Sequence, residues 1–203
     1  MVLVKYNNLG QQQWNTTWGG TKFETGISIA LDSSENIYVC GFTGSYGAGG
    51  FDMFLLKYNN LGQLQLSKLW GGIEDDFGNS ITLDSSDNLY VGVSTESYGA
   101  GGRDIVLLKC NSSGQQQWNT TWGGVNDDEV RTVVVDSSEN IYLAGTTSSF
   151  GAGGLDMVLI KYAESSGGND EGGILGYDLF LLLGAICVIS TIIIKKHQNQ
   201  QYL

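Results

Sequence analysis

The chain has 203 residues, a formal net charge of −11, no proline and 30 glycines. Nucleic-acid phosphates require a surface rich in Lys and Arg, so this acidic composition argues against DNA or RNA as a partner. Glycine at this level without proline favours many tight turns between short strands over a disordered linker.

A sequence repeat with a constant step covers residues 1–162. Four short apolar runs each contain a lysine near their end, at positions 5, 57, 109 and 161, so the step is 52 residues throughout. Trp18-Gly-Gly recurs at Trp70 and Trp122 with the same step. Self-similarity at a fixed spacing of this size is typical of propellers and other repeat folds.

Each repeat is expected to contain four strands, which are clearest in the second copy at 80–83, 89–95, 104–109 and 115–122. The first two flank an Asp-Ser-Ser-Asp-Asn segment, whose residues favour a turn, so they form a hairpin. The middle runs are apolar at consecutive positions, which indicates strands covered on both faces. The fourth run alternates Trp with polar residues, as in a half-exposed edge strand.

This pattern predicts an all-β fold of β-propeller-type repeats with four-stranded antiparallel blades. The chain offers about three blades: complete copies at 22–72 and 74–124, three strands in 125–162 and two strands in 1–20. Closed propellers have roughly four to eight blades, so we expect an open arc or a part of a larger propeller. Self-association through the open blade faces is one way to cover them. The alternative is that the chain is the C-terminal part of a longer protein, because Met1 aligns within a blade.

The repeat resembles the SBBP family of bacterial and archaeal β-propeller repeats. The residues that carry the resemblance are Trp70-Gly-Gly, Asp75-Asp76, the run 80–91 and Asp104-Ile-Val-Leu-Leu-Lys109. The resemblance covers the part of the chain before the tail. It implies a propeller blade and an extracellular or surface location, without an assigned catalytic activity.

The tail is predicted to anchor the protein in a membrane. Residues 163–173 form a polar linker, and 174–194 form an apolar run that is followed by Lys195 and Lys196. About 20 apolar residues cross a bilayer as a helix, so we predict one transmembrane helix at 174–196 and a short tail at 197–203. The lysines favour the cytoplasmic side, which places the repeats outside the cell membrane. Gly-Tyr-Asp-Leu-Phe at 176–180 also resembles the C-terminal anchor of predicted archaeal surface proteins.

Acidic pairs follow two of the Trp-Gly-Gly motifs and are the candidate ion site. Together with nearby carbonyl groups, their carboxylates could bind calcium. A solvated or self-capping loop and a general acid–base pair are the alternatives. The residues are Asp75, Asp76, Asp127 and Asp128.

Other chemistry has few candidates. The chain has a single histidine, His197, and three scattered cysteines, so we predict no zinc cluster, no Ser-His-Asp triad and no cofactor. Three segments match the N-glycosylation pattern, at Asn15, Asn111 and Asn119. The tryptophans could stack on sugars, although packing is the expected role.

The lysines and aspartates that recur at every step are expected to be structural, for example as Lys–Asp pairs between strands, because an active site converges only once. We therefore predict a non-catalytic, membrane-anchored extracellular repeat protein that acts as a surface scaffold or binding module for a protein or glycan partner. A purely structural cell-surface component, and an activity that lies upstream of Met1 in a longer protein, are the alternatives.

Overall fold

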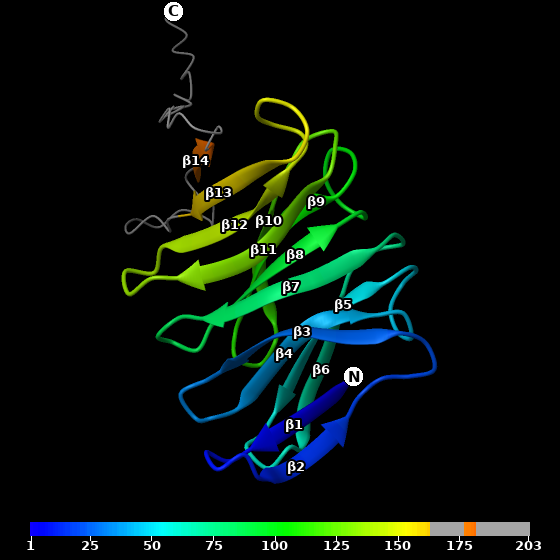
Figure 1. Ribbon diagram of the computed structural model, residues 1–203, viewed down its shortest axis with the longest axis vertical. Coiled ribbons are helices and arrows are strands. Elements are labelled where there is room, and N and C mark those ends of the chain that lie inside the picture. Colours follow the sequence, from blue (N-terminus) through cyan, green and yellow to red (C-terminus); the bar gives the residue numbers. More distant parts are fainter. Residues whose placement is uncertain (163–176, 182–203) are drawn as a thin grey trace, which may run out of the picture.

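The computed structural model describes residues 1–162 and the strand 177–181, which are all β-strands and turns (Figure 1). The strands are β1 Val2–Tyr6, β2 Gln12–Thr17, β3 Glu24–Leu31, β4 Ile37–Thr43, β5 Asp52–Tyr58, β6 Leu64–Trp70, β7 Asp76–Leu83, β8 Leu89–Thr95, β9 Asp104–Cys110, β10 Gln116–Trp122, β11 Asp128–Val135, β12 Ile141–Thr147, β13 Asp156–Tyr162 and β14 Tyr177–Leu181.

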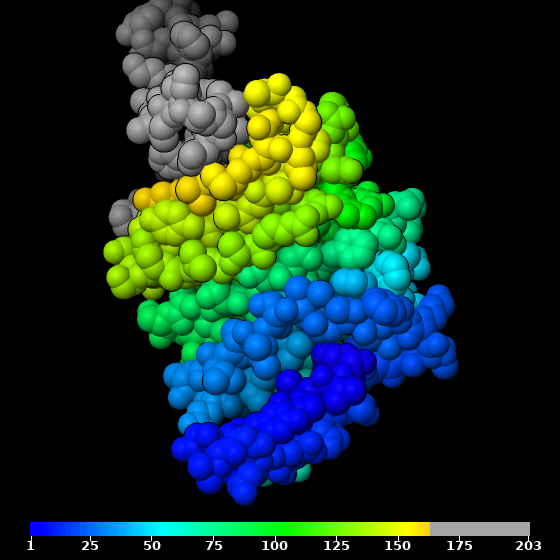
Figure 2. Space-filling view, in the orientation of Figure 1, coloured from blue at the N-terminus to red at the C-terminus, as the bar shows by residue number. Residues whose placement is uncertain are grey.

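These strands form four antiparallel sheets in chain order. The first is the pair β1-β2, and it is followed by β3-β4-β5-β6, β7-β8-β9-β10 and β11-β12-β13-β14. The sheets stack on one another along the long axis, from β1-β2 at one end to β11-β14 at the other (Figure 1), and Figure 2 shows them as consecutive bands of colour. The predicted four-stranded antiparallel blades are confirmed.

The hairpin between the first two strands of each blade is built as predicted. In the first copy, the Asp32 carboxylate accepts hydrogen bonds from the backbone N–H groups of Ser34 and Asn36, at 3.0 and 2.8 Å. Glu35 has a positive φ of 63°, and the same position is positive in the two later copies. Burial raises the pKa of Asp32, but the hydrogen bonds from Asn36 and Lys57 outweigh it and lower the pKa overall.

The core lies between the blades. Every residue of β8 and β9 is buried, because these strands are covered by a neighbouring sheet on each face. Tyr38 and Met53 of one blade pack into the same cluster as Val91 and Val106 of the next. By contrast, β10 alternates exposed and half-buried residues, as expected for the outer strand.

The recurring lysines pair with their own blade. The Nζ atom of Lys57 lies 3.3 Å from the Asp32 carboxylate and 4.8 Å from the centre of the Tyr38 ring. Lys109 and Lys161 lie over Tyr90 and Tyr142 in the same way. The predicted structural Lys–Asp pair between strands is therefore confirmed at Lys57 and Asp32.

The three strands predicted in 125–162 are confirmed as β11, β12 and β13. The sheet has one strand more than predicted, because β14 from the tail pairs with β13, with Leu159 opposite Phe180 in the antiparallel register. These five residues belong to the predicted transmembrane segment 174–196. The rest of that segment, the linker 163–173 and the tail 197–203 lie outside the described residues. Within the described part, no helix is long and apolar enough to cross a membrane.

Candidate functional site: a phenylalanine patch

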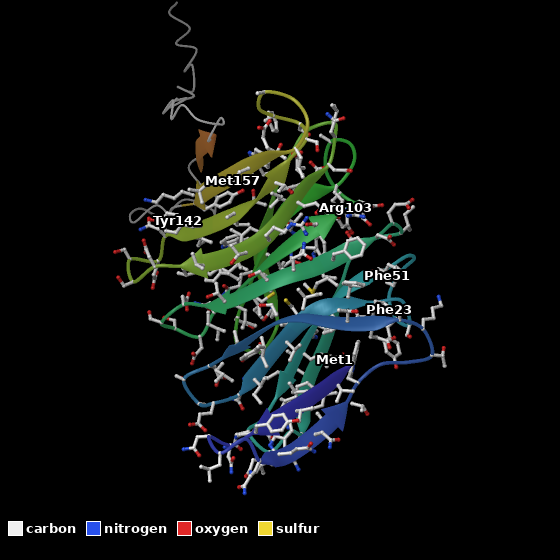
Figure 3. The ribbon with its side chains drawn as sticks, in the orientation of Figure 1. Met1, Phe23, Phe51, Arg103, Tyr142 and Met157 are labelled. Atoms are coloured by element: carbon white, nitrogen blue, oxygen red, sulfur yellow. The ribbon has the colours of Figure 1, made fainter. Side chains whose placement is uncertain are left out.

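Four phenylalanine rings meet at one end of the blades, where first and third strands begin. Phe23 directly precedes β3, Phe51 directly precedes β5, and Phe42 and Phe77 lie in β4 and β7. We call these four residues the phenylalanine patch. Phe23 is 60% exposed, and the other three are half-buried. Figure 3 labels Phe23 and Phe51 on the same side of the molecule.

The rings pack edge to face around Phe42. Its ring centre lies 4.9 Å from that of Phe77 and 5.2 Å from that of Phe51, with interplanar angles of 84° and 74°. Phe23 completes the group at 6.0 Å from Phe42. Edge-to-face geometry of this kind is favoured by the quadrupoles of the rings, so the patch is a preformed apolar surface.

The patch departs from the repeat at each of its four positions. The residues one or two repeat steps away are polar or aliphatic: Asp75 and Asp127 for Phe23, Ser94 and Thr146 for Phe42, Arg103 and Leu155 for Phe51, Thr25 and Glu129 for Phe77. Within residues 1–162 the rings therefore gather once, and they are not a requirement of the blade.

An ionic network borders the patch. The Arg103 guanidinium lies 4.7 Å from the centre of the Phe77 ring and donates hydrogen bonds to Glu96 and Glu129, at 2.8 and 2.7 Å. Glu129 also pairs with Arg131 at 2.6 Å. Burial lowers the pKa of Arg103, but the two carboxylates outweigh it and raise the pKa overall. The border is therefore charged, while its charges are largely paired.

Two of the predicted calcium ligands position residues of this surface instead of meeting their sequence neighbours. The Asp75 carboxylate accepts the backbone N–H of Phe51 at 2.8 Å, and the Asp127 carboxylate accepts that of Arg103 at 3.0 Å. Each acid thus holds the loop that precedes a third strand in the blade before its own. The structure does not bring Asp75 and Asp76 together.

The other two predicted ligands are buried beside different acids. Asp76 accepts hydrogen bonds from Gly72 N–H and the Ser97 hydroxyl, both at 2.7 Å, and from the Thr95 hydroxyl. Its carboxylate and that of Asp52 both crowd the space above the Cα of Gly71. These two acids come from consecutive blades and form a carboxylate pair.

The pair recurs one blade later as Asp104 and Asp128, which are 1% and 0% exposed. One oxygen of each, Oδ1, has no hydrogen-bond partner among the described residues. Burial raises the pKa of Asp104, the hydrogen bond from Ala100 N–H opposes this, and the charge of Asp128 raises it further. Asp52 has a raised pKa for the same reasons. Such a pair can hold a shared proton or contribute to a cation site.

In the described part of the chain, no group of three or more His, Cys, Asp or Glu side chains is arranged to hold a metal ion. A separate polar groove of about 490 Å³ is lined by Asn36, Lys57, Gln65, Leu66, Ser112 and Ser113. The Lys57 ammonium is already paired there with Asp32, so this groove presents mainly amide and hydroxyl groups.

The glycosylation candidates fall into two kinds of position. Asn15 and Asn119 are exposed on the outer strands β2 and β10. Asn111 is half-buried, and its side-chain oxygen accepts the N–H groups of Ser113 and Gln115 within a turn. The amide of Asn111 is therefore committed to the turn, whereas the other two point to open surface.

The tryptophans pack, as expected. Trp18, Trp70 and Trp122 lie against Tyr46, Tyr98 and Phe150, with ring centres 5.3, 5.2 and 5.1 Å apart. Because the contact recurs between each pair of consecutive sheets, it belongs to the stacking of the blades.

No family model matches this sequence. The chain is 24% identical over 166 residues to the regulatory protein FlaEY of Caulobacter vibrioides, a match that covers 70% of this chain and 17% of that protein's length. Among solved structures, a protein of unknown function from Bacteroides caccae has a TM-score of 0.49 and 9% sequence identity, over 77% of this chain and 59% of that one.

The phenylalanine patch was not predicted from the sequence. Its members are separated by as many as 54 positions, from Phe23 to Phe77, and each appears in the sequence as one more apolar residue. The sequence does contain one indication of the patch. When the copies are aligned, the phenylalanines at these four positions are replaced by other residue types.

Proposed function

We propose that this protein is a non-catalytic surface scaffold and binding module whose phenylalanine patch binds an apolar segment of a protein partner. The observation that carries the proposal is that four rings from four elements converge once, where the repeat supplies other residues. Solvent-exposed aromatic clusters with a charged border resemble the centre and rim of protein interfaces.

The chemistry of the patch favours a protein segment over a glycan. Phenylalanine rings offer apolar area without a hydrogen-bond donor, whereas sugar recognition relies on polar groups beside the stacking face. The neighbouring Arg103 already donates to Glu96 and Glu129. The partner is therefore expected to insert aliphatic or aromatic side chains against Phe23 and Phe51.

Binding can be tested with the full chain in nanodiscs, panned against a displayed peptide library and probed in parallel on a glycan array. Phe23→Ser removes an exposed ring, and Phe150→Ser is the matched control, since Phe150 lies against Trp122 outside the patch. Burial of one such ring contributes about 1.5–3 kcal/mol, so Phe23→Ser should weaken a selected peptide about ten- to hundredfold.

Equal binding by both variants would remove the patch from the proposal, and selection of glycans alone would move the partner to that class. Failure to select any ligand would favour the purely structural role at the cell surface. Such a role draws support from the recurring Lys57–Tyr38 and Trp70–Tyr98 contacts, which hold each blade and its neighbour together.

We further propose that the apolar run in 174–196 holds the protein in the cell membrane, with the repeats outside, and that residues 177–181 give up their pairing with β13 when this run enters the membrane. The support is the apolar run followed by Lys195 and Lys196. The full chain should stay with membranes in alkaline carbonate, and a chain that ends at residue 173 should be released. Release of both would contradict the anchor.

A further inference from the structure

The polar groove of about 490 Å³ lies where one blade departs from the repeat. Trp14 of β2 and Trp118 of β10 each stand one repeat step from Leu66 of β6. Leu66 lines the groove, which is walled on one side by its own blade and on the other by the turn at Ser112 and Ser113 of the next blade. The repeat thus has an indole ring at the position where this blade has an open groove.

The first copy shows how an indole fills this position. The Trp14 ring lies on the turn of the next sheet, so closely that a Cβ atom on Gly62 would come within 2.9 Å of it. Its Nε1–H donates to the carbonyl of Asn60 at 3.1 Å. Leu66 touches the equivalent turn at Gly114 with a methyl group. Because a leucine side chain is much smaller than an indole, space remains beside Leu66 between the two blades.

The lysine at the groove has one aromatic neighbour fewer than its counterpart in the next blade. Lys109 Nζ lies 5.1 Å from the centre of the Tyr90 ring and 5.7 Å from that of Trp118. Lys57 Nζ lies 4.8 Å from the centre of the Tyr38 ring, and among the described residues no second ring lies over it. An ammonium group attracts the face of an aromatic ring. The groove therefore keeps the cation that elsewhere in the chain holds an indole.

The amide groups of the groove are available mainly as hydrogen-bond acceptors. The side-chain nitrogen of Asn36 donates to Asp32 at 2.8 Å, and that of Gln65 donates to the Gln63 carbonyl at 3.2 Å. Each amide is thereby left with its oxygen for a ligand. The pairing of β6 with β5 shifts register at Gln65, so Gln65 and Leu66 line the groove together although they are consecutive.

We propose that this groove binds a small molecule of the indole type, which has a flat aromatic ring and N–H donors. The ring lies against Leu66 and the Lys57 ammonium, and the N–H groups donate to the amide oxygens of Asn36 and Gln65. Lys57 is already paired with Asp32, so a neutral ligand suits the groove better than a carboxylate. A free small molecule is favoured over a protein segment, because the volume is that of small-molecule sites and acceptors surround a single apolar side chain.

The test uses the full chain in nanodiscs and N-acetyltryptophanamide with a fluorine on its ring, followed by fluorine NMR with empty nanodiscs as the blank. We expect saturable binding with a dissociation constant of about 0.1 mM, the ordinary strength for a ligand of about 20 non-hydrogen atoms. Leu66→Trp fills the groove with an indole of the chain itself, so it should weaken binding at least tenfold without lowering the Tm.

Leu69→Trp is the matched control, because it adds the same ring on the opposite face of β6, where Leu69 is 42% exposed. Its binding should equal that of the wild-type chain. Gln65→Ala removes an acceptor at an exposed residue and should weaken binding about two- to tenfold. Phe23→Ser should leave binding unchanged, so that this inference and the phenylalanine patch fail separately.

Any of three results would overturn the inference: no binding beyond the blank, equal binding by Leu66→Trp and the wild-type chain, or an equal loss with Leu69→Trp. A loss with Phe23→Ser would assign the probe to the phenylalanine patch and overturn it as well. If Leu66→Trp lowers the Tm, Gln65→Ala decides, and unchanged binding by that variant would reject the groove as the site.

Discussion

Replacing Asp104 by asparagine should stabilise the protein at neutral pH. Asp104 and Asp128 are buried side by side, and an oxygen of each lacks a partner among the described residues. A buried polar atom without a partner costs about 1–3 kcal/mol. The asparagine keeps an oxygen for Ala100 N–H and brings an amide that can donate to Asp128. We expect a gain of about 1–2 kcal/mol, or about 2–8 °C in Tm for a domain of this size.

The stability gained by Asp104→Asn depends on pH. The folded pKa of Asp104 is raised above its ordinary value of 3.8, so its proton is held more tightly in the folded state. The associated stability is fully present below pH 3.8 and is lost as pH rises through the folded pKa. The advantage of Asp104→Asn should therefore be absent at low pH and grow toward neutrality.

Thermal unfolding followed by circular dichroism from pH 4 to pH 8 measures this. Asp156→Asn is the matched control, because Asp156 accepts the equivalent loop N–H of Ala152 at 2.9 Å but meets no second buried acid in the described residues. A lower Tm for Asp104→Asn at pH 7.5, or a gain that is the same at pH 4, would refute the reasoning. If millimolar calcium raised the Tm of the wild-type chain but not of this variant, the pair would be a cation site.

Three further predictions concern single buried groups. Tyr58→Phe should leave Tm unchanged or raise it slightly, because the buried hydroxyl has no partner among the described residues; a fall of several degrees would contradict this. Lys57→Met should cost about 1–2 kcal/mol in urea unfolding, since Asp32, 4% exposed, loses its ammonium partner while Lys57 itself is partly solvated. Burial raises the pKa of Cys40 to about 12 and of Cys110 to about 11, so peptide mass spectrometry should find both alkylated far more slowly in the native chain than after unfolding.

Much of the fold follows from local chemistry. The turn at Asp32 forms because its carboxylate bonds the next backbone N–H groups, and β8 is apolar throughout because both of its faces are covered. The strand β14 was not predicted, because a short apolar run inside a longer one does not distinguish a strand from a helix. Periodicity carries no information on which five residues will pair with a sheet.

The contacts of the acidic residues were harder to predict, for a geometrical reason. Asp75 and Asp76 are adjacent in sequence and suggest one ligand pair, but successive side chains of an extended chain point to opposite sides. Asp75 therefore reaches the Phe51 loop, while Asp76 turns inward to Asp52. The neighbour of each acid comes from the preceding blade, about 24 positions away, and a linear pattern does not reveal that contact.

The repeat itself separates structural from functional residues. A contact that recurs from copy to copy, such as Lys57 over Tyr38, Lys109 over Tyr90 and Lys161 over Tyr142, is sufficiently explained by the structure of the blade. Phe51 has no such explanation, since Arg103 and Leu155 replace it in the later copies. Asp75 connects a recurring residue to a residue that varies. The acid recurs at Asp127, and in both copies it accepts the backbone N–H of the residue before a third strand, which is Phe51 in one copy and Arg103 in the other. The blade thus provides a constant support on which the side chain at this surface position can change without loss of the fold.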